Sequence, residues 1–304
     1  MKIAIIGAGA LGSVYGSFLS IKNNDIVLIT RRQEQAETIN KEGILIRYKN
    51  KNKRYHPRAS MDPSSLADRD LFILLVKTYD LNNVSDLLLK YSRNDSIILS
   101  LLNGLGNVET LSFKCGMNRI LAGVSYIGAQ KISDTQIEIG GVLKTVMGEP
   151  SGFISDRLSR ISFLFKDAGF DTYLSNDINR LLWEKMVITT SQNALSAITG
   201  FTIGQMHSSQ YCRFIILQLL DELTKVAAKE GIELPRNLLE RVLENSKALP
   251  NHHGSMWQDL QAGHRTEIDA INGAIVELGQ KHGLPTPYNE FITYLMHVLE
   301  KKTS

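Results

Sequence analysis

One lysine lies in a segment that is otherwise almost entirely apolar. The run Leu181–Ile188 has the pattern of a buried helix, yet it contains Lys185, and lysine is rarely buried without a reason. A four-residue spacing places Thr189 and Asn193 on the same helical stripe as Lys185. An ammonium beside a hydroxyl and an amide is suited to hold an oxyanion and protonate it. The alternative is that Lys185 extends to solvent and pairs with Glu184 or another acid.

Three further polar residues are candidates for the same site. Glu267 is expected to open a helix, with Thr266 as its N-cap and its carboxylate beside the apolar stripe of that helix. Ordinary capping is the alternative role for Glu267. Asn103 begins the segment Asn-Gly-Leu-Gly-Asn after a predicted strand, where open α/β sheets bind ligands. Ser255 begins the segment Ser-Met-Trp-Gln-Asp.

A glycine-rich segment near the amino end predicts a dinucleotide-binding loop. The strand Lys2–Ile6 leads directly into Gly-Ala-Gly-Ala-Leu-Gly, which has the GxGxxG spacing and opens an apolar helix. Gly7 permits the tight turn, Gly9 lets the backbone approach a pyrophosphate, and Gly12 permits close helix–strand packing. An ordinary glycine-rich turn is the alternative. The predicted cofactor-binding residues of the loop are Gly7, Gly9, Ala10, Leu11 and Gly12.

The end of the second predicted strand indicates which nicotinamide cofactor is used. NAD-binding loops carry an acidic residue ~20 positions after the glycines, and it binds the ribose 2′-hydroxyl. This chain instead has Arg31 and Arg32 there, and a guanidinium can bind a 2′-phosphate through paired hydrogen bonds. We therefore predict NADP(H) as the cofactor, with Arg31 as its phosphate ligand. The alternative is two solvated arginines on a loop.

The elements that must position these residues form two predicted domains. The first should be a Rossmann-type α/β domain over residues 1–170, because short β-branched runs alternate with helical segments. Its parallel strands are predicted at Lys2–Ile6, Ile26–Ile29, Leu71–Val76 and Ser96–Leu101. A hairpin is expected from Ile44–Tyr48 and Arg54–Ala59 around a turn at Lys49–Lys53. Antiparallel runs at Ile120–Ala129, Ile137–Ile139 and Leu143–Gly148, with a turn at Gly140-Gly141, should make one edge of the sheet mixed.

The second predicted domain, residues 171–304, should be entirely helical. Its helices are expected at Ile178–Ile198, Ser209–Lys229, Arg236–Ala248, Glu267–His282 and Asn289–Lys301, and the boundary between the domains within residues 167–179. Gly231, Gly283 and the pair Pro285 and Pro287 lie where helices should end. The helix expected at Ser209–Lys229 could pair with a second copy across a two-fold axis or pack within one chain. The sequence is therefore compatible with either a monomer or a homodimer.

Composition excludes several classes of protein. The 304 residues carry a net charge of only +3 without a clustered basic face, so nucleic acid is not expected as a partner. Cys115 and Cys212 lie far apart, and the adjacent His252 and His253 have no third ligand at zinc spacing, so no disulfide or metal site is predicted. We expect no signal peptide, and no apolar run in the sequence reaches the length of a membrane span. We expect a cytoplasmic protein with a small-molecule partner.

Taken together, these motifs are similar to those of the ketopantoate reductase (2-dehydropantoate 2-reductase) family over essentially the whole chain. The motifs that carry the resemblance are Gly7–Gly12, Arg31, Val76-Lys77, Asn103–Asn107, Trp183–Lys185, Asn193–Ala197, Ser255–Asp259 and Thr266–Asp269. The resemblance implies a Rossmann domain, a helical domain like the carboxy-terminal domain of 6-phosphogluconate dehydrogenase, and a cleft between them. It also implies NADPH-dependent reduction of ketopantoate to pantoate for pantothenate biosynthesis.

The resemblance assigns roles to individual residues. Lys185 would be the general acid and Glu267 would support it or the substrate. Asn103, Asn193 and Ser255 would hold the substrate, and Lys77 and Asn103 would lie near the cofactor. Two positions depart from the family pattern. Thr189 replaces an asparagine one turn after the lysine, in the expected substrate pocket, and Leu102 replaces a glutamine.

Two other functions stay open. The Thr189 and Leu102 departures allow an NADPH-dependent reductase of a different branched 2-oxo acid. A catalytically inactive NADP(H) sensor is the third possibility, but such a protein would have no use for a proton donor at Lys185.

Overall fold

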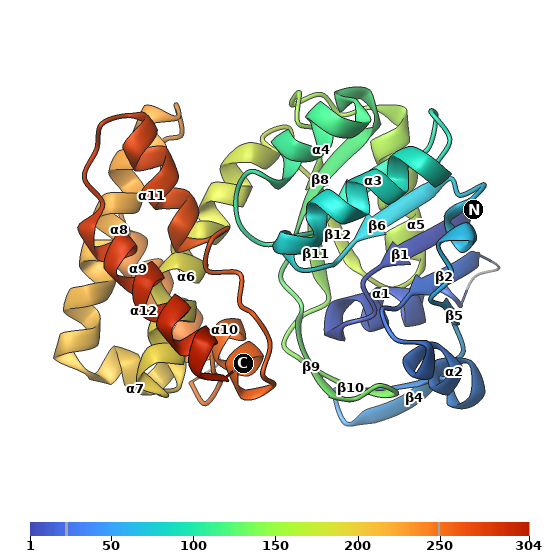
Figure 1. Cartoon of the computed structure of the whole chain (residues 1–304), viewed down its shortest axis with the longest axis horizontal. Helices are drawn as coiled ribbons and strands as arrows, with labels where there is room; N and C mark the ends of the chain where they lie inside the picture. Colours follow the sequence, from blue (N-terminus) through green and yellow to red (C-terminus); the bar gives the residue numbers. More distant parts are fainter. Residues whose placement is uncertain (22–23, 249, 304) are drawn as a thin grey trace. The chain divides into compact units, whose positions relative to one another are not determined.

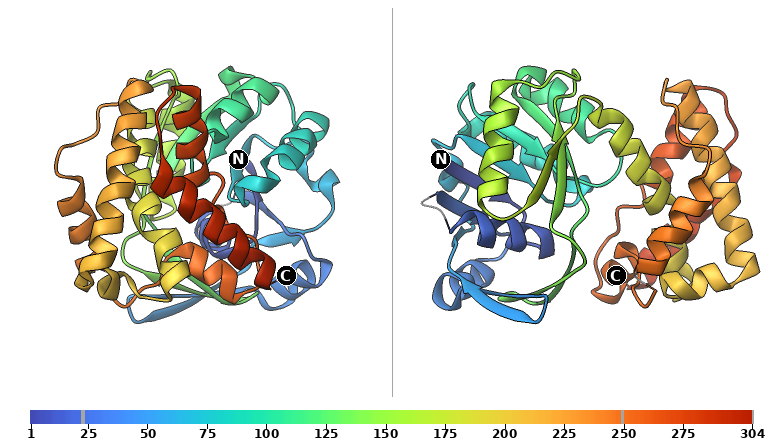
Figure 2. Two further views of the ribbon diagram at one scale, coloured as in Figure 1. Left: turned by 60° about the vertical axis from the view of Figure 1, so that its left-hand side comes forward. Right: turned by 180° about the vertical axis from the view of Figure 1, so that it is seen from behind.

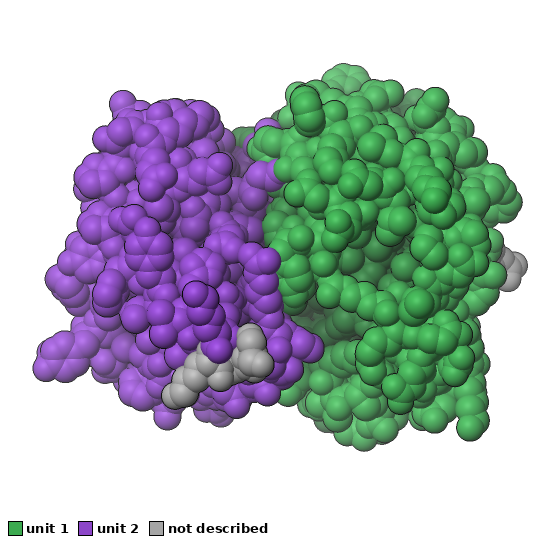
Figure 3. All heavy atoms as spheres, viewed as in Figure 1, with its two compact units in different colours: residues 1–102, 107–178 green, residues 103–106, 179–304 purple. Residues whose placement is uncertain are grey.

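The computed structural model describes residues 1–21, 24–248 and 250–303, which divide into two compact units (Figure 3). The first unit contains Met1–Leu102 and Asn107–Ile178, and the second contains Asn103–Gly106 and Asn179–Ser304. The chain passes from the first unit to the second after residue 178, because the strand β12 (Asp171–Leu174) still pairs in parallel with β11 (Lys144–Gly148). The short segment Asn103–Gly106 groups with the helices although the chain on both sides of it belongs to the first unit.

The first unit is built on an eight-stranded sheet with the strand order β12-β11-β8-β7-β6-β1-β2-β5. Its other strands are β1 (Lys2–Ile6), β2 (Asp25–Ile29), β5 (Arg58–Ser60), β6 (Leu71–Leu74), β7 (Ile97–Ser100) and β8 (Ile120–Ser125). In this sheet β11 runs antiparallel to its neighbour β8, and the other neighbouring strands are parallel. The predicted parallel sheet with one mixed edge is thus confirmed. Its central strands β6 and β7 are buried along their whole length because helices cover both faces.

Helices cover opposite faces of this sheet (Figures 1 and 2). On one face, α1 (Ala10–Leu19) and α5 (Asp156–Asp167) meet through the ring contact of Tyr15 and Phe165, whose centroids lie 5.6 Å apart. On the other lie α3 (Leu81–Tyr91) and α4 (Asn107–Cys115). The remaining helical segments are α2 (Gln33–Glu42) and the short 3₁₀ turns at Pro63–Leu66, Thr78–Asp80 and Met117–Arg119.

A separate four-stranded sheet, in the order β4-β3-β10-β9, corrects two predictions. Its strands are β3 (Ile44–Tyr48), β4 (Lys51–Tyr55), β9 (Gly128–Ser133) and β10 (Gln136–Gly140). The predicted five-residue turn is only Lys49 and Asn50, both with positive φ (48° and 60°), as in a tight hairpin turn. Gly140-Gly141 does not close a hairpin, since β10 pairs with β9 and β3 whereas β11 joins the main sheet.

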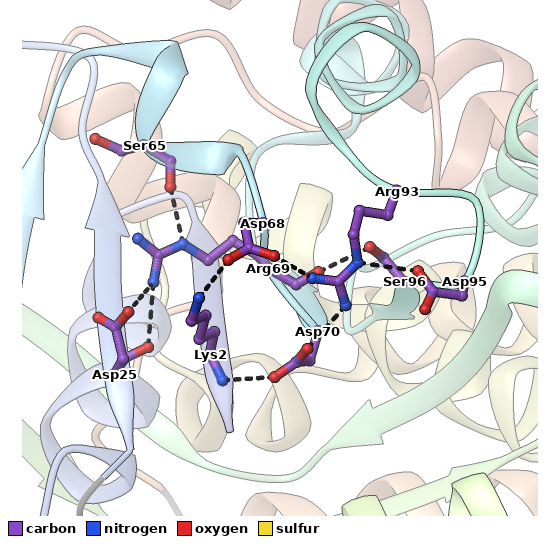
Figure 4. Close-up of polar contacts among 9 residues, drawn as sticks. All are labelled: Lys2, Asp25, Ser65, Asp68, Arg69, Asp70, Arg93, Asp95 and Ser96. Carbon is purple, nitrogen blue, oxygen red and sulfur yellow. Dashed lines mark hydrogen bonds and ion pairs between the residues drawn. The ribbon is translucent and has the colours of Figure 1, made fainter.

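Charged residues tie together the amino ends of the central strands (Figure 4). Arg93 pairs with Asp70 at 2.9 Å, and the carboxylate of Asp70 also accepts the backbone N–H of Lys2 at 2.8 Å. The buried guanidinium of Arg69 pairs with Asp25 at 2.8 Å. These contacts fix the strands at the end opposite to the glycine loop, where open α/β sheets bind no ligand.

The second unit is helical, as predicted. Its helices are α6 (Ile178–Thr199), α7 (Ile203–Ser208), α8 (Gln210–Lys229), α9 (Leu238–Ala248), α10 (Ser255–Gln261), α11 (Asn272–Lys281) and α12 (Pro287–Thr303). The short α7 and α10 were not predicted, because six or seven residues are too few to show a helical period. Pro287 starts α12 instead of ending a helix, since proline fits the first turn. None of the helices in the described part of the chain is long and apolar enough to cross a membrane.

A buried polar network joins four helices of this unit. The carboxylate of Glu222 on α8 accepts the backbone N–H groups of Tyr288 and Asn289 at the start of α12, each at 2.9 Å. The amide oxygen of Asn289 accepts Nδ2 of Asn272 at 3.0 Å, and the same nitrogen donates to the carbonyl of Thr190 on α6 at 3.1 Å. Buried polar groups must be satisfied in this way, so the network fixes α6 and α11 against each other.

Candidate functional site

Lys185 lies in the middle of α6, and its ammonium meets a side chain from a distant part of the sequence. Nζ donates to Oδ1 of Asn103 at 2.6 Å. Burial lowers the pKa of Lys185 from 10.5 to about 8, and the nearby charge of Glu267 acts in the opposite direction. Glu184 does not serve as its partner, because that carboxylate pairs with Arg180 and Arg241 at 2.9 and 3.2 Å. The pKa of Lys185 is thus within the range in which a lysine can exchange protons near neutral pH.

The loop that carries Asn103 is held in place by its backbone. Gly104 has a φ of +84°, and a Cβ at this position would lie 2.3 Å from the carbonyl oxygen of Ala270, so only glycine fits. The N–H of Leu105 donates to the same carbonyl at 3.0 Å. The Nδ2 group of Asn103 donates to Oε2 of Glu267 at 3.4 Å. The amide of Asn103 therefore links the ammonium of Lys185 with the carboxylate of Glu267.

Glu267 does not open a helix, which corrects the prediction. It is buried in a turn, and α11 begins only at Asn272. The carbonyl of Ala270 accepts a hydrogen bond from the N–H of Leu105 in the Asn103 loop. Within the turn, three-residue hydrogen bonds, such as that from the N–H of Ala270 to the carbonyl of Glu267 at 3.1 Å, replace the regular hydrogen bonds of an α-helix. Thr266 is no N-cap of α11 either: its hydroxyl accepts the N–H of Ile268 at 3.3 Å and donates to Glu300 at 2.6 Å.

A second polar pair lies farther along α6. Nδ2 of Asn193 donates to Oγ of Ser255 at 3.1 Å, so the structure brings together two residues assigned to the substrate. Gly254 makes this possible, because a Cβ there would lie 2.9 Å from the Cα of Asn193. Thr189 lies between this pair and Lys185 on the same helix. Its hydroxyl, however, is directed to the helix backbone, 3.3 Å from the carbonyl of Lys185.

The three glycines of the loop in the first unit have different surroundings. Gly7 and Gly12 are closely packed, and only the position beside Gly9 is open. Gly7 has a φ of +109°, and a Cβ there would meet the carbonyl of Leu75 at 2.6 Å. A Cβ on Gly12 would lie 1.8 Å from the carbonyl of Gly7, so this glycine permits the helix to pack on the loop. No described atom lies within 4 Å of the corresponding point on Gly9. The helix α1 then starts at Ala10 without a side-chain cap, which suits the binding of a phosphate by its amino end.

The two arginines after β2 differ in their partners. Arg32 is paired with Asp134 at 2.7 Å. Arg31 is more than half exposed and pairs with Asp80, which follows β6 in a 3₁₀ turn. Lys77 is the residue immediately before that turn. The pairing of Arg31 with Asp80 could not be predicted from sequence, because it depends on the strand order that brings β2, β1 and β6 together.

These contacts define two groups of residues, one in each unit. In the first unit, an open glycine loop and an exposed guanidinium suit the phosphates of a dinucleotide. In the second, an ammonium of lowered pKa beside an amide and a carboxylate suits the protonation of an oxyanion. Within residues 1–21, 24–248 and 250–303, no three His, Cys, Asp or Glu side chains are grouped so that they could hold a metal ion.

Comparison with known proteins gives consistent matches over nearly the whole chain. The family model described as "Ketopantoate reductase PanE/ApbA" matches residues 3–152, and its "C terminal" counterpart matches residues 177–300. A 2-dehydropantoate 2-reductase of Pyrococcus horikoshii is 30% identical over 304 residues, covering 99% of this chain and 98% of that protein.

Two solved structures are similar along their whole length. A PanE/ApbA family ketopantoate reductase from Ralstonia eutropha has a TM-score of 0.92 and 28% identity, covering 100% of this chain and 99% of that chain. The ternary structure of D-mandelate dehydrogenase with NADH and anilino(oxo)acetate has the same TM-score and 27% identity, with the same coverage.

Proposed function

Because this chain belongs to the ketopantoate reductase family, we propose that it catalyses the NADPH-dependent reduction of ketopantoate to pantoate, a step of pantothenate biosynthesis. The observation that carries the proposal is the group formed by Lys185, Asn103 and Glu267, with Nζ of the lysine 2.6 Å from the amide oxygen of Asn103. A small 2-oxo acid is the expected partner.

The residues of this group have complementary tasks. A bound nicotinamide would supply a hydride to the 2-oxo carbon, and negative charge would then develop on the carbonyl oxygen. The ammonium of Lys185 stabilises this charge and donates the proton that completes the hydroxyl group. Asn103 orients the ammonium through its amide oxygen. Glu267 raises the pKa of Lys185 against the effect of burial, so most of the lysine stays protonated at neutral pH.

The remaining assigned residues bind the two reactants. Asn193 and Ser255 present an amide and a hydroxyl that can bind the carboxylate or hydroxyl of the acid. In the first unit, Gly7, Gly9, Ala10, Leu11 and Gly12 would hold the pyrophosphate. Arg31 would bind the 2′-phosphate, which makes NADP(H) the preferred cofactor, and Lys77 would lie near the nicotinamide.

The position of Thr189 supports a second candidate, the reduction of a different 2-oxo acid. Its hydroxyl is directed to the carbonyls of Lys185 and Met186 at 3.3 and 3.4 Å, so it is engaged with its own helix. A 2-oxo acid with no polar group near Thr189 would lose no binding free energy. Ketopantoate could leave an oxygen there without a hydrogen-bond partner, at a cost of ~1–3 kcal/mol. The similarity to a D-mandelate dehydrogenase adds phenylglyoxylate to the acids worth testing.

A substrate panel tests the proposal. Purified protein is mixed with NADPH or NADH and with ketopantoate, 2-oxoisovalerate, 2-oxobutyrate, pyruvate or phenylglyoxylate, and oxidation of the cofactor is followed by absorbance. We expect the highest kcat/KM with ketopantoate and NADPH. A higher value with another acid would favour the second candidate. If NADPH binds but none of the five acids is reduced, the result would favour the NADP(H) sensor over both reductase candidates.

A further inference from the structure

The turn that carries Glu267 is held by a residue near the end of α12. Glu267 lies before the start of α11, so the hydrogen bonds of that helix do not fix its backbone. Glu300, 34 positions after Thr266, supplies an acceptor instead: its Oε1 accepts the backbone N–H of Thr266 at 2.7 Å and the hydroxyl of the same residue at 2.6 Å. A carboxylate from a separate helix thus holds the residue next to Glu267.

The hydroxyl of Thr266 extends this restraint to the other side of Glu267. While it donates to Glu300, its oxygen accepts the N–H of Ile268 at 3.3 Å. One carboxylate therefore fixes the backbone N–H groups on both sides of Glu267, directly at Thr266 and through the hydroxyl at Ile268. All three residues of the turn are at most 5% exposed, and a buried N–H group needs an acceptor. Without Glu300 the turn would have to rearrange to find other acceptors.

Glu300 is itself fixed by its surroundings. Its side chain is only 12% exposed, and its Oε2 lies 3.1 Å from Nδ1 of His297, one turn earlier on α12. Nε2 of the same ring lies 2.9 Å from Oδ1 of Asp269, which also pairs with Arg265 at 2.8 Å. The end of α12 thus contacts the turn at two points, one before and one after Glu267.

We propose that Glu300 is a positioning residue of the candidate site and that it acts through the turn on the carboxylate of Glu267. This carboxylate accepts Nδ2 of Asn103 at 3.4 Å, and the amide oxygen of Asn103 accepts Nζ of Lys185 at 2.6 Å. Both the hydrogen bond and the charge effect weaken as Glu267 moves away. The inference rests on the proposed function, in which Lys185 is the proton donor.

A displacement of Glu267 should be measurable at Lys185. Burial lowers the pKa of this lysine to about 8, and the charge of Glu267 raises it against the effect of burial. A turn released from Glu300 would let the carboxylate move away, so the pKa of Lys185 should fall further. Because this effect passes through Glu267, it should disappear in a variant that lacks the charge of Glu267.

Two variants of Glu300 separate its hydrogen bonds from its charge. Glu300→Ala removes the acceptor of Thr266. Glu300→Gln removes the charge but keeps an oxygen that can accept both the N–H and the hydroxyl of Thr266. The NH₂ group of the glutamine can donate to Nδ1 of His297 when the ring proton is on Nε2. A positioning role therefore predicts that Glu300→Gln retains what Glu300→Ala loses.

A further variant and a control complete the set. Thr266→Val has nearly the same shape as the wild type but lacks the hydroxyl that joins Glu300 to Ile268, so it decides the question if Glu300→Ala does not fold. Glu290→Ala is the matched control, because this carboxylate lies on the same helix and accepts the hydroxyl of Tyr294 at 3.1 Å on the exposed side.

Competitive labelling with acetic anhydride, followed by mass spectrometry of the peptide that contains Lys185, measures the pKa of this lysine without any catalysed reaction. Glu300→Ala should lower this pKa by about one unit. The same variant should reduce kcat/KM at pH 7 by ~10- to 100-fold, while its affinity for NADPH is unchanged. Thr266→Val should change both quantities in the same direction but less. Glu300→Gln and Glu290→Ala should stay within a few-fold of the wild type. In a Glu267→Gln background, Glu300→Ala should cause no further shift of the pKa.

Three outcomes would overturn the proposal. The first is an unchanged pKa of Lys185 in Glu300→Ala, folded by circular dichroism, or in Thr266→Val if Glu300→Ala does not fold. The second is a Glu300→Gln variant as impaired as Glu300→Ala, which would mean that the charge acts and not the hydrogen bonds. The third is a pKa shift that persists in the Glu267→Gln background. If the wild type reduces no 2-oxo acid, the proposed function fails, but the labelling of Lys185 still decides whether Glu300 positions Glu267.

Discussion

The amide of Asn103 accepts a hydrogen bond from Nζ of Lys185 at 2.6 Å and donates one to Glu267 at 3.4 Å. Lys185 and Asn103 are 82 positions apart in the sequence. One side chain thus fixes the direction of the ammonium and connects it to the carboxylate that modifies its pKa. Three measurable properties of the protein should depend on this arrangement: the pH profile, the turnover and the stability.

The reduction rate should fall as the pH rises through the pKa of Lys185. Burial lowers that pKa to about 8, and only the protonated lysine can donate a proton, so kcat/KM should decrease tenfold per pH unit above it. Glu267→Gln removes a charge that raises the pKa. This variant should therefore lose activity at a lower pH than the wild type. A pH profile of kcat/KM for both proteins checks this. An unchanged profile in the variant would show that Glu267 does not affect the pKa of the group that titrates.

Lys185→Met should make the protein inactive and more stable. Loss of the general acid should lower kcat by ~10²–10⁴ while NADPH still binds. In the folded state the pKa of Lys185 lies at about 8, below its unfolded value of 10.5, so the charged form costs stability below pH 8. Stability then rises with pH between 8 and 10.5, because the unfolded state binds more protons there.

The variant should consequently gain about 1–3 kcal/mol at pH 7, seen as a higher Tm, and this gain should shrink toward pH 10. Lys225→Met is the control, since Lys225 is an exposed lysine on α8 that pairs with Asp221. It should change neither kcat nor Tm. Turnover of Lys185→Met within a few-fold of the wild type would contradict the role of the lysine.

Arg31→Ala should weaken the use of NADPH far more than that of NADH. A charge-assisted contact to a phosphate contributes ~1.5–3 kcal/mol, so the KM for NADPH should rise about 10- to 100-fold with little change for NADH. Arg32→Ala is a matched control, because it also removes one guanidinium from an ion pair, here with Asp134, but Arg32 is not assigned to the 2′-phosphate. Steady-state kinetics with both cofactors measure the difference. Equal losses with NADPH and NADH in Arg31→Ala would remove the basis for NADP(H) preference.

Alanine at two glycines of the loop should have different effects. Gly12→Ala would place a Cβ 1.8 Å from the carbonyl of Gly7, so the strand and the helix must separate and the Tm should fall. Gly9→Ala meets no described atom within 4 Å. It should fold normally but bind NADPH at least tenfold more weakly, because the methyl group occupies the space of the pyrophosphate. Thermal melting and fluorescence titration with NADPH distinguish the two. Unchanged NADPH affinity in Gly9→Ala would place the cofactor elsewhere.

Glu222→Gln should destabilise the helical unit. The carboxylate accepts three N–H groups, from the backbone of Tyr288 and Asn289 and from Nδ2 of Asn289. An amide would turn an NH₂ group toward one of these donors, and a buried donor without an acceptor costs ~1–3 kcal/mol. Asp221→Asn is the control, since its pair with Lys225 is exposed and such pairs contribute little. Urea unfolding of both variants gives the free energies. Equal stabilities would contradict the role of the network.

Local pattern was sufficient for most of the fold. Parallel strands such as Leu71–Leu74 are buried on both faces, so they appear in the sequence as short apolar runs. Long helices such as Ile178–Thr199 differ from them in length alone. The local sequence pattern gave a wrong prediction where contacts with residues distant in the sequence determine the backbone conformation. After Glu267, the carbonyl of Ala270 accepts a hydrogen bond from the N–H of Leu105 in the Asn103 loop. The residue types at 266–272 do not indicate this contact.

The candidate site shows the same division. The stripe of Lys185 and Asn193 and the exposed position of Arg31 follow from short-range spacing. The pairing of Arg31 with Asp80 and the contact of Asn103 with Glu267 arise from strand order and from the placement of a loop among helices. The roles of these residues in catalysis and binding stay predictions until the variants are measured.

The segment Asn103–Gly106 limits how this protein could be assembled from parts. It follows β7 in the chain, yet it belongs to the helical unit. A fragment that begins at residue 179 would contain Lys185 and Glu267 but not the amide between them. In a chimaera of two relatives joined at residue 179, this amide would come from the relative that supplies the first unit. Exchange of the two halves between relatives would therefore also exchange the partner of the lysine, so the two halves must evolve together at this loop.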